Sequence, residues 1–155
     1  MIPIQGLYEA HLNVADLDRS MSFYENVVGL ELAQVFSERK VAFYWIGGRK
    51  SMLGLWQVGT SPQRLSLHIA FAVELQDLLK VPARLRGVGV EPRDFEGKPS
   101  LEPVVLAWMP AAAVYFYDPD GHLLEFLCLL PQAPRPELGV LPWNQWPGHE
   151  QLAAQ

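Results

Sequence analysis

The feature that most constrains the fold is a pattern of segments that occurs twice along the chain. The first copy covers about residues 6–58 and opens with GLYEAHLNV, which has the two-residue period of a strand. The next segment, ADLDRSMSFYENVVG, has helical spacing, with Asp16 suited to cap its start and Gly29 its end. Three short strand-like segments follow, namely LELAQVF, VAFYWIGG and MLGLWQV. This order predicts a βαβββ module.

The second copy covers about residues 65–130 and has a similar order. It opens with LSLHIAFAV and continues with ELQDLLKVPARLRGVG, a helical pattern in which Pro82 predicts a late start or a kink. The strand-like segments after it are VEPRDF, which is weakly marked, VVLAWM, AVYFYD and HLLEFLCLL. His11 and His68 occupy matching positions in the two opening strands, 57 residues apart (68 − 11). Two copies of one module predict an α+β fold.

Length and composition predict one globular domain over residues 1–131, followed by a tail. Of the 155 residues, 50% are hydrophobic and 19% are charged, which is enough apolar sequence for a sizeable core. Residues 132–155 are rich in proline and predict irregular chain, anchored by Trp143 and Trp146 packing on the domain or on a partner subunit. A lid over a substrate is the alternative interpretation of this tail.

The charge pattern and the single cysteine narrow the setting in which the chain works. The net charge is −5 and the 12 basic residues are scattered, which argues against nucleic acid or an anionic membrane as a partner. No apolar stretch is long enough to span a membrane, and the first residues do not resemble a secretory signal. Cys128 has no second cysteine for an internal disulfide, so a reducing cytoplasm is expected.

Glu125 points most directly to a site, because it lies in the middle of the apolar run HLLEFLCLL. A buried carboxylate is costly unless it is paired or coordinates a metal ion. Strand alternation places His11 and His68 on faces where a cavity is expected. Two imidazoles and one carboxylate from three strands suit a divalent ion that keeps open positions for a substrate or water. The plainer alternatives are structural histidines and a Glu125 that faces water from an edge strand.

Two segments, HLNVADLDRSMSFYENVVGLEL and VYFYDPDGHLLEF, resemble the vicinal oxygen chelate superfamily. This superfamily includes glyoxalase I, extradiol dioxygenases, fosfomycin-resistance enzymes and bleomycin-resistance proteins. The resemblance implies two βαβββ modules that form a curved mixed sheet around a metal or ligand pocket. It also implies that His11, His68 and Glu125 bind one divalent ion, which could be Fe, Mn, Ni or Zn. Tyr115 matches a tyrosine near the substrate in some members and could donate a proton there, although ordinary cavity packing explains it equally well.

Three departures from the members of this superfamily bear on the reaction. The segment SMLGLWQV has no carboxylate for the fourth ligand of bacterial glyoxalase I. The stretch from Gly47 to Leu67 contains no histidine, whereas two-domain extradiol dioxygenases use one before the second ligand. The segment LAWMPAAA lacks the serine and lysine that fosfomycin thiol-transferases place upstream of the tyrosine. The resemblance therefore specifies a fold and a metal site more closely than a reaction.

Two functions are predicted from these residues. The first is a metal-dependent lyase, isomerase or extradiol-type dioxygenase, in which the ion acts as a Lewis acid on a small oxygen-chelating substrate and Tyr115 and Glu125 are catalytic. The alternative is a metal-independent protein that binds and sequesters a small molecule, in the manner of bleomycin-resistance proteins. The resemblance favours a homodimer. His122, in the DPDGH turn, is expected to be exposed and outside the site.

Overall fold

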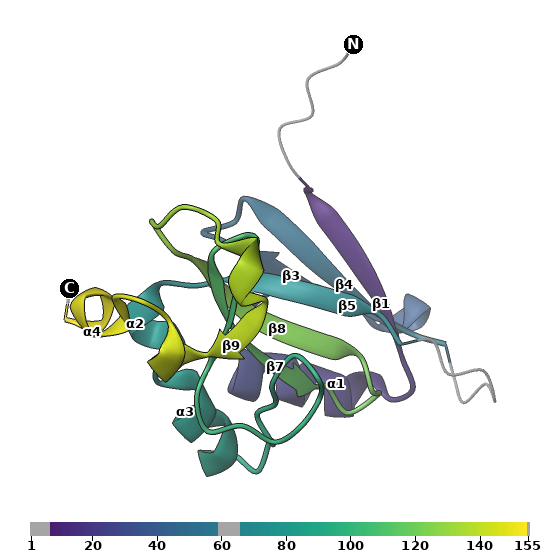
Figure 1. Cartoon of the computed structure of the whole chain (residues 1–155). Coiled ribbons are helices and arrows are strands. Elements are labelled where there is room, and N and C mark those ends of the chain that lie inside the picture. Colours follow the sequence, from purple (N-terminus) through teal and green to yellow (C-terminus); the bar gives the residue numbers. More distant parts are fainter. Residues whose placement is uncertain (1–6, 59–65, 155) are drawn as a thin grey trace. The chain divides into compact units, whose positions relative to one another are not determined.

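The computed structural model describes residues 7–58 and 66–154, which form two compact units (Figure 1). The first unit consists of the chain up to Leu67 together with Asp118–Gly121, and the second consists of His68–Tyr117 and the chain from His122 onward. Gly6 and Leu65, which open the two predicted modules, lie outside the described residues. Each unit has a mixed sheet with helical segments, so the predicted α+β fold is confirmed.

The first sheet has the strand order β1-β4-β3-β2. Strand β1 (Glu9–Val14) pairs in parallel with β4 (Ser51–Gln57), which pairs antiparallel with β3 (Val41–Ile46). Strand β2 (Glu31–Phe36) completes the sheet and is followed by a short 3₁₀ turn, η2 (Ser37–Arg39). The parallel β1–β4 pairing places His11 directly opposite Gly54.

Helix α1 (Leu17–Phe23) follows β1 and packs against β3 and β4. The Asp16 side chain accepts a hydrogen bond from the backbone N–H of Arg19, which satisfies one of the free donors at the helix start. The helix runs into one π-helical turn, η1 (Tyr24–Val28), and ends at Gly29, whose φ of 83° lies in the left-handed region. The predicted cap and end of this helix are confirmed.

The DPDG turn is attached to the start of this helix, although it is distant in the sequence. The carboxylate of Asp120 accepts hydrogen bonds from the backbone N–H of Ala15 at 3.0 Å and from Ser20 Oγ at 2.9 Å. Asp118 Oδ2 accepts a hydrogen bond from the buried hydroxyl of Tyr24 at 3.0 Å. These contacts explain why residues 118–121 belong to the first unit.

The second sheet has five strands in the order β5-β8-β7-β6-β9. Its edge strand β5 (His68–Ala72) pairs in parallel with β8 (Leu123–Leu129), and the remaining pairs are antiparallel. Strand β7 (Ala111–Tyr117) lies between β8 and the short β6 (Val104–Leu106). Strand β9 (Val140–Pro142) comes from the tail.

The predicted second helix is broken into α2 (Leu75–Leu78) and α3 (Val81–Gly87), with Pro82 in the first turn of α3. Proline is tolerated there because the N–H it lacks would have no partner within the helix. Of the two predicted effects of Pro82, a late start is wrong, since α2 already begins at Leu75, and an interruption close to the proline is what the structure shows. Helix α2 packs against β7 and β8. None of the helices in the described part of the chain is long and apolar enough to cross a membrane.

Two expectations about the second half of the chain are wrong. The segment VEPRDF forms no strand; only Arg93 makes isolated bridges, to Tyr115 and to Pro99, because the prolines around it cannot donate to a ladder. The tail is partly regular rather than irregular, since it contains β9 as well as the segments η3 (Pro136–Leu138), η4 (Trp143–Gln145) and α4 (His149–Ala153). The boundary at residue 131 stays a prediction.

Candidate metal centre

Glu125 lies at the centre of β8, between Ala70 of β5 and Tyr115 of β7. The residue is only 4% exposed, so the burial predicted from the sequence is confirmed and the alternative of a solvent-facing edge residue is wrong. One carboxylate oxygen, Oε2, lies 3.0 Å from Nε2 of His68. The other, Oε1, is buried and has no hydrogen-bond partner. A buried carboxylate oxygen without a donor is costly unless a cation completes its surroundings.

His68 is the second member of this pair and is open to solvent on its other side. Its side chain is 46% exposed, whereas that of Glu125 is 6% exposed. Ala70 and Ala72 share its face of β5 and are also exposed, so small side chains leave room beside the imidazole. Two ligand atoms bound at right angles to one ion through bonds of about 2.1 Å lie about 3.0 Å apart. The observed separation therefore fits a nitrogen and an oxygen that share a divalent ion.

Tyr115 closes the other side of the carboxylate. It is directly opposite Glu125 on β7, is 6% exposed, and its ring centroid lies 6.2 Å from that of His68. Burial raises the pKa of the Tyr115 phenol, and the negative charge of the neighbouring Glu125 raises this pKa further. The phenol therefore keeps its proton at neutral pH and can donate a hydrogen bond within the site.

His11 belongs to the first unit, where both of its ring nitrogens have partners. Nδ1 accepts a hydrogen bond from Nε1 of Trp56 at 2.5 Å, and Nε2 lies 3.2 Å from Oε1 of Glu9. The ring lies against the backbone of Gly54, where an added Cβ would come within 2.7 Å of Nδ1. Phe43 contacts the ring edge to face, with centroids 5.9 Å apart. His11 can bind an ion only if it releases Trp56 or Glu9.

The structure thus brings together three of the four predicted site residues, Glu125, His68 and Tyr115, within one unit. Among the described residues of either unit, no three His, Cys, Asp or Glu side chains are close enough together to hold a metal ion. The pair of ligands in the second unit is incomplete by itself. The set of His11, His68 and Glu125 stays a prediction.

Sequence reasoning missed Gly54, which lies beside His11, and gave the wrong exposure for His122. Gly54 makes room for the His11 ring, and its signal was a glycine in the interior of the strand-like segment MLGLWQV, which often marks a close approach. His122 was expected to be exposed but is 1% exposed. It comes directly before β8, whose second and third residues, Leu124 and Glu125, are also buried.

A buried carboxylate beside a half-exposed imidazole, in an α+β fold of two small mixed sheets, defines a candidate metalloprotein. The family model described as Glyoxalase/Bleomycin resistance protein/Dioxygenase superfamily matches residues 6–126. The chain belongs to this superfamily. The predicted resemblance to the vicinal oxygen chelate proteins is therefore confirmed.

Relatives with known names or structures are similar over most of their length. A metallothiol transferase FosB from Shouchella clausii is 31% identical over 131 residues, covering 79% of this chain and 79% of that protein. The crystal structure of integron cassette protein HFX_CASS4, from the mobile metagenome of a Halifax Harbour sewage outfall, has a TM-score of 0.71 and 33% identity, over 81% and 100% of the two chains. The fosfomycin resistance protein FosX from Listeria monocytogenes, complexed with Mn(II) and sulfate, has a TM-score of 0.62 and 27% identity, over 88% and 98%.

Proposed function

We propose that the chain is a divalent-metal-dependent enzyme in which His11, His68 and Glu125 hold the ion. The observation that carries this proposal is the buried Glu125 carboxylate, with Oε1 lacking a partner and Oε2 3.0 Å from a half-exposed imidazole. A cation is the partner that would offset the cost of burying this charge. His11 would supply the third ligand, from the matching strand of the other module.

The relatives support the expected divalent metal and leave its identity open. One is named a metallothiol transferase, and another was crystallised with Mn(II). Their names also support a small organic molecule as the substrate. We also propose that the protein forms a homodimer and is located in the cytoplasm.

The residues of the site suggest how a substrate would be handled. The bound ion would act as a Lewis acid towards neighbouring oxygens of the substrate. Glu125 would offset part of the positive charge of the ion, and the exposed side of His68 would leave room for the substrate to approach. Tyr115, which keeps its proton, would donate a hydrogen bond to an oxygen on which negative charge develops. Addition of a nucleophile to a small oxygen-bearing substrate is the reaction class that these groups and the relatives support best.

One observation favours the alternative, a metal-independent binding protein. Both ring nitrogens of His11 are already engaged, by Trp56 and Glu9. In such a protein the three residues would line a binding cavity without holding an ion. The two functions differ in whether the purified chain takes up metal.

Metal uptake and turnover test the proposal. The full chain is stripped with a chelator, dialysed against Mn(II), Fe(II), Ni(II) or Zn(II), and analysed by mass spectrometry of the metal content. We expect about one ion per chain, lost in His68→Ala and Glu125→Gln and kept in His149→Ala, which removes an imidazole from the tail. The loaded protein is then screened against catechols, glutathione hemithioacetals and epoxides with a thiol. Unchanged metal content in both site variants would contradict the proposal.

A further inference from the structure

Four aromatic rings of the second unit form a continuous row that begins at the candidate metal centre. The rings of His68 and Tyr115 have centroids 6.2 Å apart, those of Tyr115 and Phe95 are 6.1 Å apart, and those of Phe95 and Trp108 are 6.1 Å apart. Both contacts of Phe95 are edge to face. Because an edge-to-face ring keeps one face free, the row presents aromatic surface for a further ring.

The two outer rings of this row are held at the surface rather than in the core. Phe95 is 52% exposed and Trp108 is 45% exposed, whereas Tyr115 beside them is buried. Single exposed apolar residues are ordinary in a folded protein. Here two large rings touch one another, and the row they extend leads to an unpartnered buried carboxylate oxygen. That continuity distinguishes this surface from scattered exposed residues.

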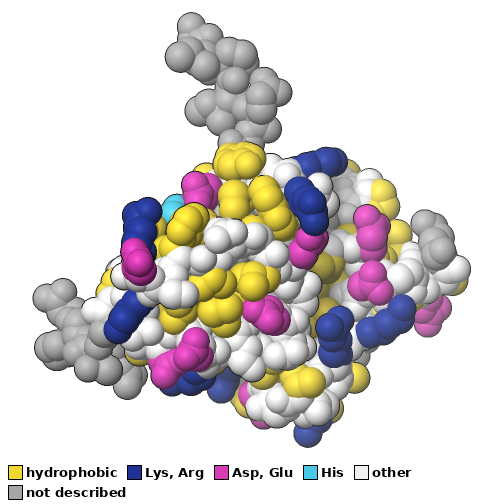
Figure 2. Space-filling view, turned by 180° about the vertical axis from the view of Figure 1, so that it is seen from behind, with side chains coloured by type: hydrophobic (Ala, Val, Ile, Leu, Met, Phe, Trp, Pro, Cys, Tyr) yellow, Lys and Arg dark blue, Asp and Glu magenta, His cyan; other side chains and the backbone are white. Residues whose placement is uncertain are grey.

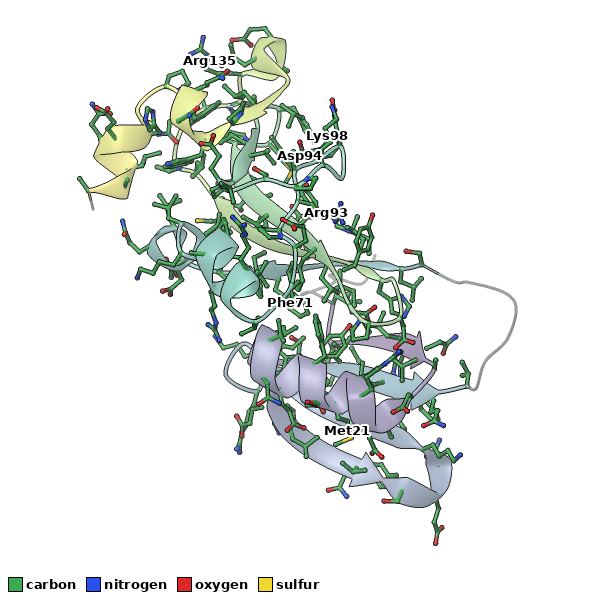
Figure 3. All side chains as sticks on the ribbon, turned by 90° about the horizontal axis from the view of Figure 1, so that it is seen from below. Met21, Phe71, Arg93, Asp94, Lys98 and Arg135 are labelled. Carbon is green, nitrogen blue, oxygen red and sulfur yellow. The ribbon has the colours of Figure 1, made fainter. Side chains whose placement is uncertain are left out.

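The loop that carries Phe95 is fixed in place by its own hydrogen bonds. Arg93 exchanges two backbone hydrogen bonds with Tyr115, at 2.7 Å and 3.1 Å, so the loop extends the sheet beside β7. Asp94 Oδ1 accepts hydrogen bonds from the backbone N–H groups of Glu96 and Lys98. Figure 3 shows Arg93, Asp94 and Lys98 together on this loop. The exposed ring of Phe95 is therefore positioned in advance, which lowers the entropic cost of binding a ligand against it.

The side chain of Arg93 makes its contacts close to its own loop. The guanidinium of Arg93 donates from Nη1 to the carbonyl oxygen of Gly97 and lies over the ring of Tyr117, with 5.5 Å from Cζ to the centroid. The positive charge of Arg93 therefore already has partners in Gly97 and Tyr117. The surface next to Tyr115 that Phe95 and Trp108 provide is apolar and aromatic.

We infer that the substrate carries an aromatic or similarly flat apolar group next to its metal-binding oxygens, and that Phe95 and Trp108 bind this group. The inference rests on the proposed function, because the oxygens must sit at Glu125 and His68 for the ring to reach this surface. Pockets for small organic molecules are commonly lined in this way, with aromatic walls and a few polar groups at one end. Phe95 and Trp108 are thus specificity residues. Tyr115 lies between them and the proposed metal ligands His68 and Glu125.

Two metal chelators, one with a methyl group and one with a phenyl group in the same position, test this inference. Acetohydroxamate and benzohydroxamate each offer two neighbouring oxygens to a metal, and only benzohydroxamate adds a phenyl group. The Mn(II)-loaded full chain is titrated with each by calorimetry. We expect benzohydroxamate to bind about tenfold more tightly, which corresponds to about 1.4 kcal/mol, because its phenyl group can stack on the rings of Phe95 and Trp108.

Variants assign the preference to the two rings. Phe95→Ala and Trp108→Ala should each lose most of the preference for benzohydroxamate while keeping the affinity for acetohydroxamate, and Phe95→Leu should keep part of it. Val88→Ala, which removes an exposed apolar side chain at the end of α3 in the second unit, is the control and should keep all of it. Thermal melts of each variant establish that it is folded.

Each remaining outcome has a definite meaning. If both hydroxamates bind equally to the unaltered chain, or if the preference survives both alanine variants, the inference is overturned while the proposed function stands. If neither binds because no metal is taken up, the proposed function fails and the inference fails with it. If Phe95→Ala changes the molecular mass in light scattering but leaves the preference for benzohydroxamate unchanged, the surface of Phe95 and Trp108 contacts a second copy of the chain. The inference is then overturned.

Discussion

The indole N–H of Trp56 donates a hydrogen bond to Nδ1 of His11 over 2.5 Å, on neighbouring strands of the first sheet. The indole N–H is only a donor, so it occupies the lone pair of this nitrogen, and Nε2 then carries the proton and faces Glu9. A nitrogen that binds a metal ion needs a free lone pair. If His11 is a metal ligand, as proposed, Trp56 and the ion would compete for its Nδ1 lone pair.

Replacing Trp56 with phenylalanine should tighten metal binding. The variant keeps most of the apolar contact but removes the competing donor, whose hydrogen bond has a net value of about 0.5–1.5 kcal/mol. We expect Trp56→Phe to bind Mn(II) about three- to tenfold more tightly, measured as free Mn(II) by electron paramagnetic resonance. Trp45→Phe, on the adjacent strand β3, is the control and should leave the affinity unchanged. An unchanged affinity in Trp56→Phe would show that His11 is not a ligand.

Adding a single methyl group at Gly54 should weaken metal binding. The new Cβ would lie 2.7 Å from His11 Nδ1, closer than real contacts allow, so the imidazole must move. Displacing a metal ligand through its supporting contacts typically reduces affinity about ten- to hundredfold. Gly87→Ala is the matched control, because a Cβ there meets nothing within 4 Å. Equal Mn(II) affinity in the two variants would count against His11 as a ligand.

The buried Tyr24 hydroxyl should make the fold sensitive to alkaline pH. Burial raises the pKa of Tyr24 above its ordinary value of 10.0, and the charge of Asp118 and the hydrogen bond to it raise this pKa further. Above about pH 10 the unfolded chain releases this proton while the folded chain keeps it, so the free energy of unfolding falls as the pH rises. Urea titrations between pH 8 and pH 11 would measure the slope.

Two tyrosine variants isolate this effect. Tyr24→Phe should lower the free energy of unfolding at pH 7 by about 1–3 kcal/mol, because a buried oxygen of Asp118 loses a donor, and should flatten the alkaline slope. Tyr8→Phe, at an exposed residue of the same unit, should change neither quantity. An alkaline slope that is as steep in Tyr24→Phe as in the unaltered chain would refute the assignment.

The tail should contribute to the stability of the second unit. Trp146 is 1% exposed and Trp143 is 7% exposed, and β9 pairs with β6. Trp146→Ala should lower the free energy of unfolding by about 3–5 kcal/mol, the usual cost of emptying a large buried site. Ala154→Gly, close to the end of the chain, is the control. A loss below about 1 kcal/mol would indicate that the tail is only loosely attached.

Local sequence patterns predicted the parts of the fold that depend on local chemistry. Asp16 as a cap, Gly29 as a helix end and the break near Pro82 each follow from the backbone requirements of one or two residues. The burial of Glu125 followed from the apolar residues on both sides of it. The tail strand β9 could not be predicted in this way, because its pairing with β6 depends on a contact distant in the sequence.

The candidate site also has features that local patterns predicted and features that depend on contacts distant in the sequence. Alternation along the strands placed His68 and Glu125 on the faces where the structure finds them. The partners of His11 were not predictable, since Trp56 and Gly54 reach it only through the parallel pairing of β1 with β4. Charge is another case: Figure 2 shows Lys and Arg side chains interspersed with Asp and Glu on one face, as the scattered basic residues suggested.

The attachment of the DPDG turn to helix α1 determines whether the two halves of the chain could fold as separate fragments. Cutting the chain between residues 58 and 66 would yield an amino-terminal fragment without Asp118 and Asp120, so the Tyr24 hydroxyl and the Ala15 amide would lose their acceptors. Such a fragment would fold poorly unless the other half were supplied with it. Although the sequence reads as a duplication, its first half depends on four residues that the second half encodes.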